Sequence, residues 1–371
     1  MHKLEMQLLL LCLRPQPDAV TCQKIQDLAR SPLNWTKLIE IAIAHAVLPL
    51  LYRGLVTARA DSTESILAQI KARCQLNTIR NLQLTQELQR LLSLLAEHNV
   101  AAVPFKGPTL AAIAYGDISL RQFSDLDILI HERDFLKTRD LLLGDRYIRA
   151  KTTTASTDID QQDAVLMHNQ GEYPFQQQDG AVNIDIHCRL ITGELPISSA
   201  RLGVFWDRLK PVSLLGTQVQ TFGPEDLLLY LCIHGAKDFW KKLIWLSDIA
   251  ALMDTYPNID WARLTQQARK LACEQMLWLG IDLVQNILGL SVPTVILQEK
   301  QTAFQKKSLS LQIQQRFLSG VLPQDVKHFY LGRFYFYAQM QNTLKEKVRY
   351  YQTYAPLLLN QWRLSKLGKP V

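Results

Sequence analysis

Two acidic residues separated by one apolar residue, Asp125 and Asp127, lead directly into the apolar stretch 128–130. In a β-strand, residues i and i+2 lie on the same face. This spacing therefore predicts that the two carboxylates project side by side while Leu126 and Ile128 point into a core. Adjacent carboxylates repel each other unless a cation lies between them, and their hard oxygens suit Mg²⁺. Taken alone, such a pair more often marks a strand edge with two solvated acids.

Two features before the acids, a Lys-Gly turn and an arginine, favour a functional site over two solvated acids. Lys106 and Gly107 stand between an apolar stretch and a predicted helix over residues 109–115. Glycine at such a turn lets the backbone approach a phosphate, and the N–H groups at a helix start favour an anion. Arg121 lies four residues before Asp125 and supplies a fixed charge suited to phosphate oxygens.

A third acid stands on a later apolar strand, in the segment VNIDIH over residues 182–187. Asp185 from this strand, beside the first pair, would complete a three-carboxylate metal site of the kind used in phosphoryl and nucleotidyl transfer. His187 lies two residues further along on the same face, and we expect it to support the acids rather than to act as a catalyst. Ser124 offers a hydroxyl donor next to the first acid.

These segments resemble the nucleotidyltransferases of the DNA polymerase β superfamily, and more closely its largely uncharacterised bacterial members. The resemblance covers residues 8 to 252 approximately and is carried by HAVLPLLYRGL, FKGPTL, YGDISLRQFSDLDILI, NIDIHCRL and PEDLLLYLCIHGAKDFWKKLIWLSDIAAL. It implies metal-dependent transfer of an NMP from an NTP to a hydroxyl-bearing acceptor, with Asp125, Asp127 and Asp185 holding Mg²⁺ or Mn²⁺. Many members have Gly-Gly or Gly-Ser where this chain has Gly107-Pro108, so phosphate binding is expected to rely more on Lys106 and Arg121.

The downstream helical segment adds candidates for nucleotide binding. His234 and Lys237 lie three residues apart after an apolar helix predicted over residues 225–234, and we expect both to contact the nucleotide. Asp248 lies in an otherwise apolar helix predicted over residues 241–253, where a buried carboxylate needs a partner. Asp248 either holds two helices together through His234 or a lysine, or faces the nucleotide or substrate.

The pattern of apolar residues predicts an α+β fold in three regions. Residues 1–99 are expected to form an N-terminal helical region, residues 100–222 an α/β core, and residues 223–371 a C-terminal helical domain. The resemblance implies that the core over residues 100–222 is a polymerase-β-like nucleotidyltransferase core. In the core we expect helices at 109–115 and 133–143. The mixed sheet is expected to contain strands 101–105, 126–131, 147–150, 164–168, 173–177 and 182–188.

Composition narrows the functional classes. The chain has 371 residues, enough for two or more domains, and its net charge of +7 suits nucleotide phosphates better than it argues for a polynucleotide partner. Six scattered cysteines contain no CxxC pair, which favours reduced thiols and a cytoplasmic protein. No apolar run is long enough for a membrane span, and the stretch 8–13 is too short for the core of a signal peptide.

A basic, aromatic-rich tail begins at residue 325. Aromatic packing with solvated lysines is the favoured interpretation, and binding of nucleic acid or of an anionic membrane surface is the alternative. Two further functions therefore stay open. One is a non-catalytic nucleotide-binding or interaction protein on the same scaffold, against which the intact acids argue. The other is a nucleic-acid-modifying enzyme that uses the tail. The sequence does not identify the NTP or the acceptor.

Overall fold

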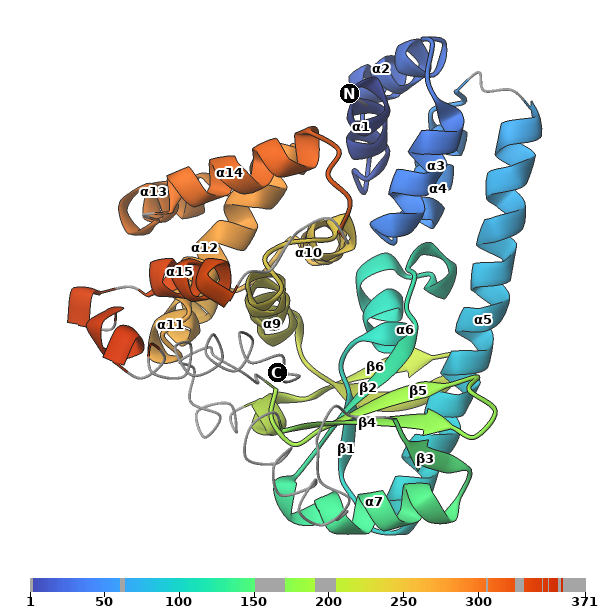
Figure 1. Ribbon diagram of the computed structural model, residues 1–371, viewed down its shortest axis with the longest axis vertical. Helices are drawn as coiled ribbons and strands as arrows, with labels where there is room; N and C mark the ends of the chain where they lie inside the picture. Colours follow the sequence, from blue (N-terminus) through green and yellow to red (C-terminus); the bar gives the residue numbers. More distant parts are fainter. Residues whose placement is uncertain are drawn as a thin grey trace, which may run out of the picture.

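The computed structural model describes residues 3–60, 64–150, 171–190, 205–323 without Gln305, 330–352 without Asn342 and Glu346, and Ala355. The expected strand 164–168 and most of the basic-aromatic tail lie outside these residues. Figure 1 shows a sheet at the bottom of the molecule, N-terminal helices above it and C-terminal helices at the left. The α+β fold with a mixed sheet and helical flanks is thus confirmed.

The N-terminal region is helical, as its apolar spacing predicted. Its helices are α1 (Lys3–Cys12), α2 (Ala19–Ala29), α3 (Trp35–Ala44), α4 (Leu48–Thr57) and α5 (Glu64–Glu97). Proline is tolerated in the first turn of a helix, and Pro49 stands there in α4. Helix α5 is 34 residues long and runs along the right side of Figure 1, from the N-terminal helices to the sheet.

The central sheet has five strands in the order β1-β2-β5-β4-β3. Their bounds are β1 (Ala102–Pro104), β2 (Asp125–Ile130), β3 (Tyr147–Arg149), β4 (Glu172–Gln177) and β5 (Asn183–His187). Strands β2 and β5 pair in parallel, whereas the other neighbours pair antiparallel. All but one of the strands expected in the core are therefore confirmed, and the exception is the segment outside the described residues.

The two faces of the sheet differ because side chains alternate along each strand. One face carries Leu126, Ile128 and Ile184, which are buried together with apolar residues of α5 and of α7 (Phe135–Gly144). The opposite face of β2 and β5 carries the acids. It lies toward α9 (Pro224–Lys237), whose Tyr230 contacts the β1 end of the sheet through Phe105. The fold thus presents the polar residues on one side of a sheet whose other side is core.

Short elements connect these strands. Helix α6 (Gly107–Leu110) continues into a π-helical turn, η1 (Ala111–Tyr115), so the expected helix begins two residues earlier than predicted. A 3-10 turn, η2 (Ile118–Leu120), precedes β2, and another, η3 (Glu132–Asp134), precedes α7. A hairpin of β6 (Lys210–Leu214) and β7 (Thr217–Thr221) was not predicted, and it turns at Leu215 and Gly216, which have φ values of 47° and 86°.

The C-terminal region is helical. It contains α9, α10 (Leu243–Thr255), α11 (Trp261–Lys270), α12 (Glu274–Leu283) with the π-helical turn η5 (Val284–Leu288), α13 (Thr294–Ala303), α14 (Lys307–Leu318) and α15 (Tyr330–Met340). The prediction that the first of these helices ends at residue 234 is wrong. Helix α9 continues to Lys237, and the chain turns only at Phe239 and Trp240, which both have positive φ. None of the helices within the described ranges is long and apolar enough to cross a membrane.

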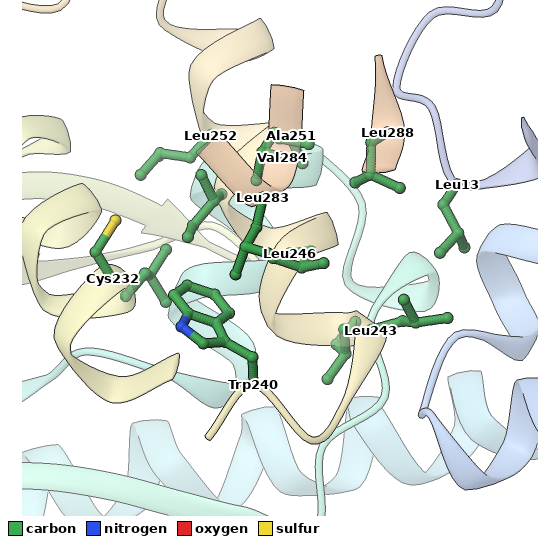
Figure 2. Close-up of a cluster of buried hydrophobic side chains, with 14 of the residues drawn as sticks. Leu13, Cys232, Trp240, Leu243, Leu246, Ala251, Leu252, Leu283, Val284 and Leu288 are labelled. Atoms are coloured by element: carbon green, nitrogen blue, oxygen red, sulfur yellow. The ribbon is translucent and has the colours of Figure 1, made fainter. Parts of the chain in front are cut away.

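The turn after α9 is held by a fully buried tryptophan, Trp240. Figure 2 shows Trp240 in a cluster with Leu246 and Leu283, and Leu13 of the N-terminal region reaches the same cluster. The indole lies against Gly235, where a Cβ atom would come within 2.4 Å of the ring. Gly235 therefore stands where no larger residue fits. The same core contains Phe336 and Tyr337 of α15, so aromatic packing is confirmed for this part of the tail.

Candidate active site

The register of β2 and β5 brings the predicted acids together. Asp127 lies opposite Asp185 in the parallel pair, and Asp125 lies opposite Asn183. Because alternate residues share a face, all three acids project from the same face of two adjacent strands. The sequence predicted this juxtaposition, and the pairing of the strands accounts for it.

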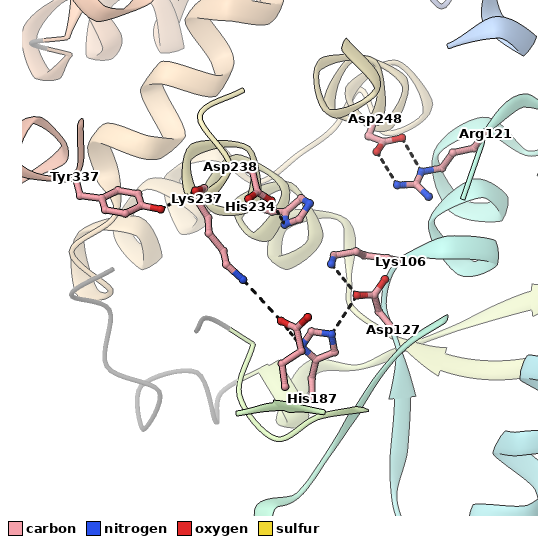
Figure 3. A network of polar contacts seen from close by, with 10 residues as sticks. Lys106, Arg121, Asp127, His187, His234, Lys237, Asp238, Asp248 and Tyr337 are labelled. Atoms are coloured by element: carbon pink, nitrogen blue, oxygen red, sulfur yellow. Dashed lines mark hydrogen bonds and ion pairs between the residues drawn. The ribbon is translucent and has the colours of Figure 1, made fainter. Parts of the chain in front are cut away.

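Asp127 is the most tightly held of the three acids. It is 6% exposed, and its Oδ1 accepts a hydrogen bond of 2.7 Å from Lys106 Nζ and lies 3.1 Å from His187 Nε2 (Figure 3). Burial alone would raise the pKa of Asp127, but Lys106 and His187 hold it well below its usual range. Burial likewise opposes the charge on Lys106, yet Asp127 raises the pKa of that ammonium well above its ordinary value. Asp127 and Lys106 therefore form a fixed ion pair.

Lys106 reaches Asp127 from the turn between β1 and α6. Gly107 follows it with a φ of +51°, and a Cβ atom at this position would lie 3.2 Å from the carbonyl oxygen of Asp125. A residue with a side chain would be strained there and would press on the backbone of β2. Glycine is thus needed at this turn.

The other two acids, Asp125 and Asp185, have raised pKa values. Burial, followed by the charge of Asp127, raises the pKa of Asp125. Burial, followed by the charges of Asp127 and Glu172, raises the pKa of Asp185 to about 7. Among the described residues, neither Asp125 nor Asp185 has an ion-pair partner. A cation that entered the site would relieve this repulsion.

Glu172 is a member of the site that the sequence did not reveal. It lies opposite His187 in the antiparallel pair of β4 and β5, and its Oε2 is 4.0 Å from His187 Nδ1 and 3.8 Å from Lys237 Nζ. Lys237 reaches this carboxylate from the end of α9 (Figure 3). The strand expected over residues 173–177 left Glu172 out, and only the strand register shows which neighbours it meets.

The structure places His234 above this face but gives it aromatic neighbours. Its ring stacks on Tyr230 at 5.9 Å and meets Trp245 edge-on at 5.4 Å. Its Nδ1 is 3.9 Å from a carboxylate oxygen of Asp238. Burial, together with the charges of Lys106 and Lys237, lowers the pKa of His234 well below its ordinary value. His234 is therefore neutral near pH 7.

Arg121 is engaged with a residue of the C-terminal region. Its Nε and Nη2 donate bonds of 2.9 Å and 3.0 Å to the two carboxylate oxygens of Asp248 (Figure 3). The Tyr115 hydroxyl donates a third bond of 2.9 Å to Asp248. The prediction that Asp248 pairs with His234 or a lysine is therefore wrong. Arg121 is 7% exposed, and its predicted contact with phosphate stays a prediction. Ser124 is exposed immediately before β2.

The acids fit a divalent cation by donor type and by charge, because three hard carboxylates lie together with two of their pKa values raised. In the part of the chain that the structure describes, however, no group of three His, Cys, Asp or Glu side chains converges on one point where a metal ion could bind. Lys106 and His187 hold Asp127 instead. Asp125, Asp127 and Asp185 are the residues that would hold a metal.

Comparison with known proteins places the chain in a nucleotidyltransferase family. The chain belongs to a family described as uncharacterised nucleotidyltransferases, whose profile matches residues 31–289. A similar solved structure is that of an antigenic nucleotidyltransferase-like protein from Paracoccidioides brasiliensis. The two sequences are 15% identical, the match covers 53% of this chain and 91% of that one, and the TM-score is 0.29. Among curated proteins no match was found. Membership of the polymerase β superfamily and a bacterial origin stay predictions.

Proposed function

We propose that this protein is a metal-dependent nucleotidyltransferase that moves an NMP from an NTP to a hydroxyl-bearing acceptor. The observation that carries the proposal is the strand register, which places Asp127 opposite Asp185 with Asp125 on the same face and the Lys106 ammonium beside them. Membership of a nucleotidyltransferase family supports the reaction class. The acceptor could be a small molecule, a protein or an RNA.

In this proposal Asp125, Asp127 and Asp185 would hold Mg²⁺ or Mn²⁺. When bound, the ion would neutralise charge on the transferred group and stabilise the attacking and leaving oxygens of an in-line displacement. Alternatively, Asp185 would act as the base that takes the proton of the acceptor hydroxyl, since it lies on the same face as the other two acids.

The basic residues around the acids would bind the phosphates. Lys106 and Lys237 approach the polar face from the β1 side and from α9, respectively. Gly107 allows close approach of the backbone, whereas Arg121 and Ser124 border β2. The neutral His234 ring, stacked on Tyr230, would face the nucleotide as a hydrogen-bonding group rather than as a charge.

Calorimetry of each NTP in Mg²⁺ tests the proposal. We expect one NTP to bind the wild-type protein only when Mg²⁺ is present, and binding to be lost in Asp125→Ala/Asp127→Ala. Asp140→Asn removes an acid of α7 whose side chain is 66% exposed and serves as the control. Equal binding by the wild type and the double variant would contradict the metal site and favour a non-catalytic scaffold.

The acceptor can then be sought with the NTP that binds, labelled at its α-phosphate. Transfer of label to small molecules, to protein or to RNA separates the acceptor classes. A nucleic-acid-modifying enzyme would bind RNA or DNA with an affinity that falls steeply with salt, whereas a small-molecule enzyme would not.

A further inference from the structure

An ammonium group already lies where a metal ion would meet Asp127. Lys106 Nζ is 2.7 Å from Asp127 Oδ1, and the side chains of the two residues are 15% and 5% exposed. The ammonium lies 5.5 Å and 5.6 Å from the ring centroids of Phe105 and Tyr230. Lys106 is thus a buried cation inside the carboxylate cluster.

The Oδ1 atom of Asp127 has a second partner besides Lys106. Asp127 Oδ1 also lies 3.1 Å from His187 Nε2, so two neighbouring groups occupy it. Asp125 and Asp185 have no ion-pair partner within the described ranges, although they share the face of the sheet with Asp127. This unequal distribution explains why the three acids do not converge on one point in this structure.

We infer that Lys106 is the resident counter-ion of Asp127 in the metal-free protein and that metal binding displaces it. A divalent ion and an ammonium bound to one carboxylate repel each other strongly in a buried site, so the two cations compete for Asp127. The displaced ammonium remains beside the metal, where it can donate a hydrogen bond to an incoming phosphate oxygen. Lys106 therefore couples metal binding to nucleotide binding. This inference rests on the proposed function.

Binding of Mn²⁺ alone, followed through the electron paramagnetic resonance signal of the free ion, tests the competition. We expect Lys106→Met to bind Mn²⁺ about tenfold more tightly than the wild type, because a competing positive charge is gone. Lys106→Arg keeps the charge and is expected to bind Mn²⁺ like the wild type. The matched control is Lys300→Met, which removes a lysine of α13 that is likewise 2.7 Å from an aspartate, Asp282.

Unchanged or weaker Mn²⁺ binding by Lys106→Met overturns the inference, as does absence of Mn²⁺ binding in both proteins. The proposed function fails by a different result, namely NTP binding that is indifferent to Mg²⁺ and to loss of Asp125 and Asp127. Tighter Mn²⁺ binding by Lys106→Met, together with a wild-type protein that binds no NTP in Mg²⁺ or Mn²⁺, would support the competition and contradict the nucleotidyltransferase.

A measurement on the wild-type chain avoids any effect of the substitution on folding. With ¹⁵N-labelled lysine, the ammonium resonance of a buried, ion-paired lysine can be followed by NMR and assigned through its absence in Lys106→Arg. We expect Mg²⁺ to shift or broaden the Lys106 resonance while that of Lys300 stays in place. A Lys106 resonance that remains unchanged at saturating Mg²⁺ would show that the ion pair persists and would overturn the inference.

Discussion

At the scale of single residues, Asp127 and Asp185 occupy matching positions in paired strands but have different electrostatic surroundings. Asp127 has Lys106 and His187 as partners, and its pKa is lowered despite burial. Burial and two neighbouring carboxylates, Asp127 and Glu172, raise the pKa of Asp185. The first charge therefore stabilises the fold, whereas the second opposes it and is retained, in our proposal, for function.

This difference predicts opposite effects on stability. Asp127→Asn leaves Lys106 buried without its counter-ion and is expected to lower the free energy of unfolding by about 3 kcal/mol. Asp185→Asn removes a repelled charge and is expected to raise it by about 1 kcal/mol, although transfer activity is lost. Urea unfolding in EDTA at pH 8 measures both values. A stability change of the same sign in the two variants would contradict this account of the cluster.

The turn that carries Lys106 makes a second prediction. Gly107→Ala places a side chain at a φ of +51° and 3.2 Å from the Asp125 carbonyl oxygen, so it is expected to destabilise the protein by about 1–2 kcal/mol. Gly144→Ala is the matched control, because a Cβ atom there meets no atom within 4 Å and the backbone is not left-handed. Thermal unfolding of the two variants makes the comparison, and equal melting temperatures would argue against a strained turn.

At the scale of elements, the Arg121–Asp248 pair joins the segment before β2 to α10. Asp248 is fully buried and accepts bonds from Arg121 and Tyr115. Such a contact fixes the start of β2, and with it Asp125, against the C-terminal helices. The position of the acids thus depends on an element more than a hundred residues away in the sequence.

Breaking this pair on one side only is expected to be severe. Asp248→Ala leaves the Arg121 guanidinium buried without a counter-ion and should lower the free energy of unfolding by about 3–5 kcal/mol. The double variant Arg121→Met/Asp248→Leu removes both charges and should recover most of that loss. Denaturant unfolding compares Asp248→Ala with the double variant. Adding the single variants Arg121→Met and Asp248→Leu completes a double-mutant cycle, which measures the coupling between the two residues. Equal destabilisation by Asp248→Ala and the double variant would mean that an unpaired buried charge is not the cause of the lost stability.

The sequence predicted elements better than it predicted their neighbours. Alternation of apolar and polar residues indicated β2 and β5, and helical spacing indicated α5. The hairpin of β6 and β7 was missed because exposed polar residues such as Thr217, Gln218 and Gln220 give it little apolar alternation. Register cannot be read from one strand, so Glu172 was missed. The packing of α10 against the segment before β2 cannot be read from one helix, so Asp248 was given the wrong partner. These contacts are set by packing between distant segments.

At the scale of the whole molecule, the N-terminal and C-terminal helices share one hydrophobic core. His45, which follows α3, is fully buried at their junction. The backbone N–H of Ile244 donates to its carbonyl oxygen at 3.3 Å, and the N–H of Leu243 donates to its Nδ1 at 3.4 Å. Its ring lies 5.8 Å from that of Phe317 in α14. His45 therefore links the N-terminal helices to α10 and α14.

This buried ring predicts that stability depends on pH. Burial, followed by the charges of Arg316 and Lys242, lowers the pKa of His45 from 6.5 to about 4. Between these pH values the unfolded chain binds a proton that the folded protein does not. The stabilisation is therefore fully present above pH 6.5 and is lost as the pH falls toward 4, by about 3 kcal/mol in total. His45→Asn keeps an acceptor for Leu243 but does not titrate, so the stability of the wild type relative to this variant should decrease as the pH falls over this range. The raised pKa of Asp185 acts equally in both proteins and cancels in this comparison. His98→Asn, at the exposed end of α5, should keep the wild-type dependence.

Urea unfolding at several pH values measures how the free energy of unfolding changes with pH in the three proteins. A slope for His45→Asn as steep as that of the wild type would assign the acid sensitivity to other groups.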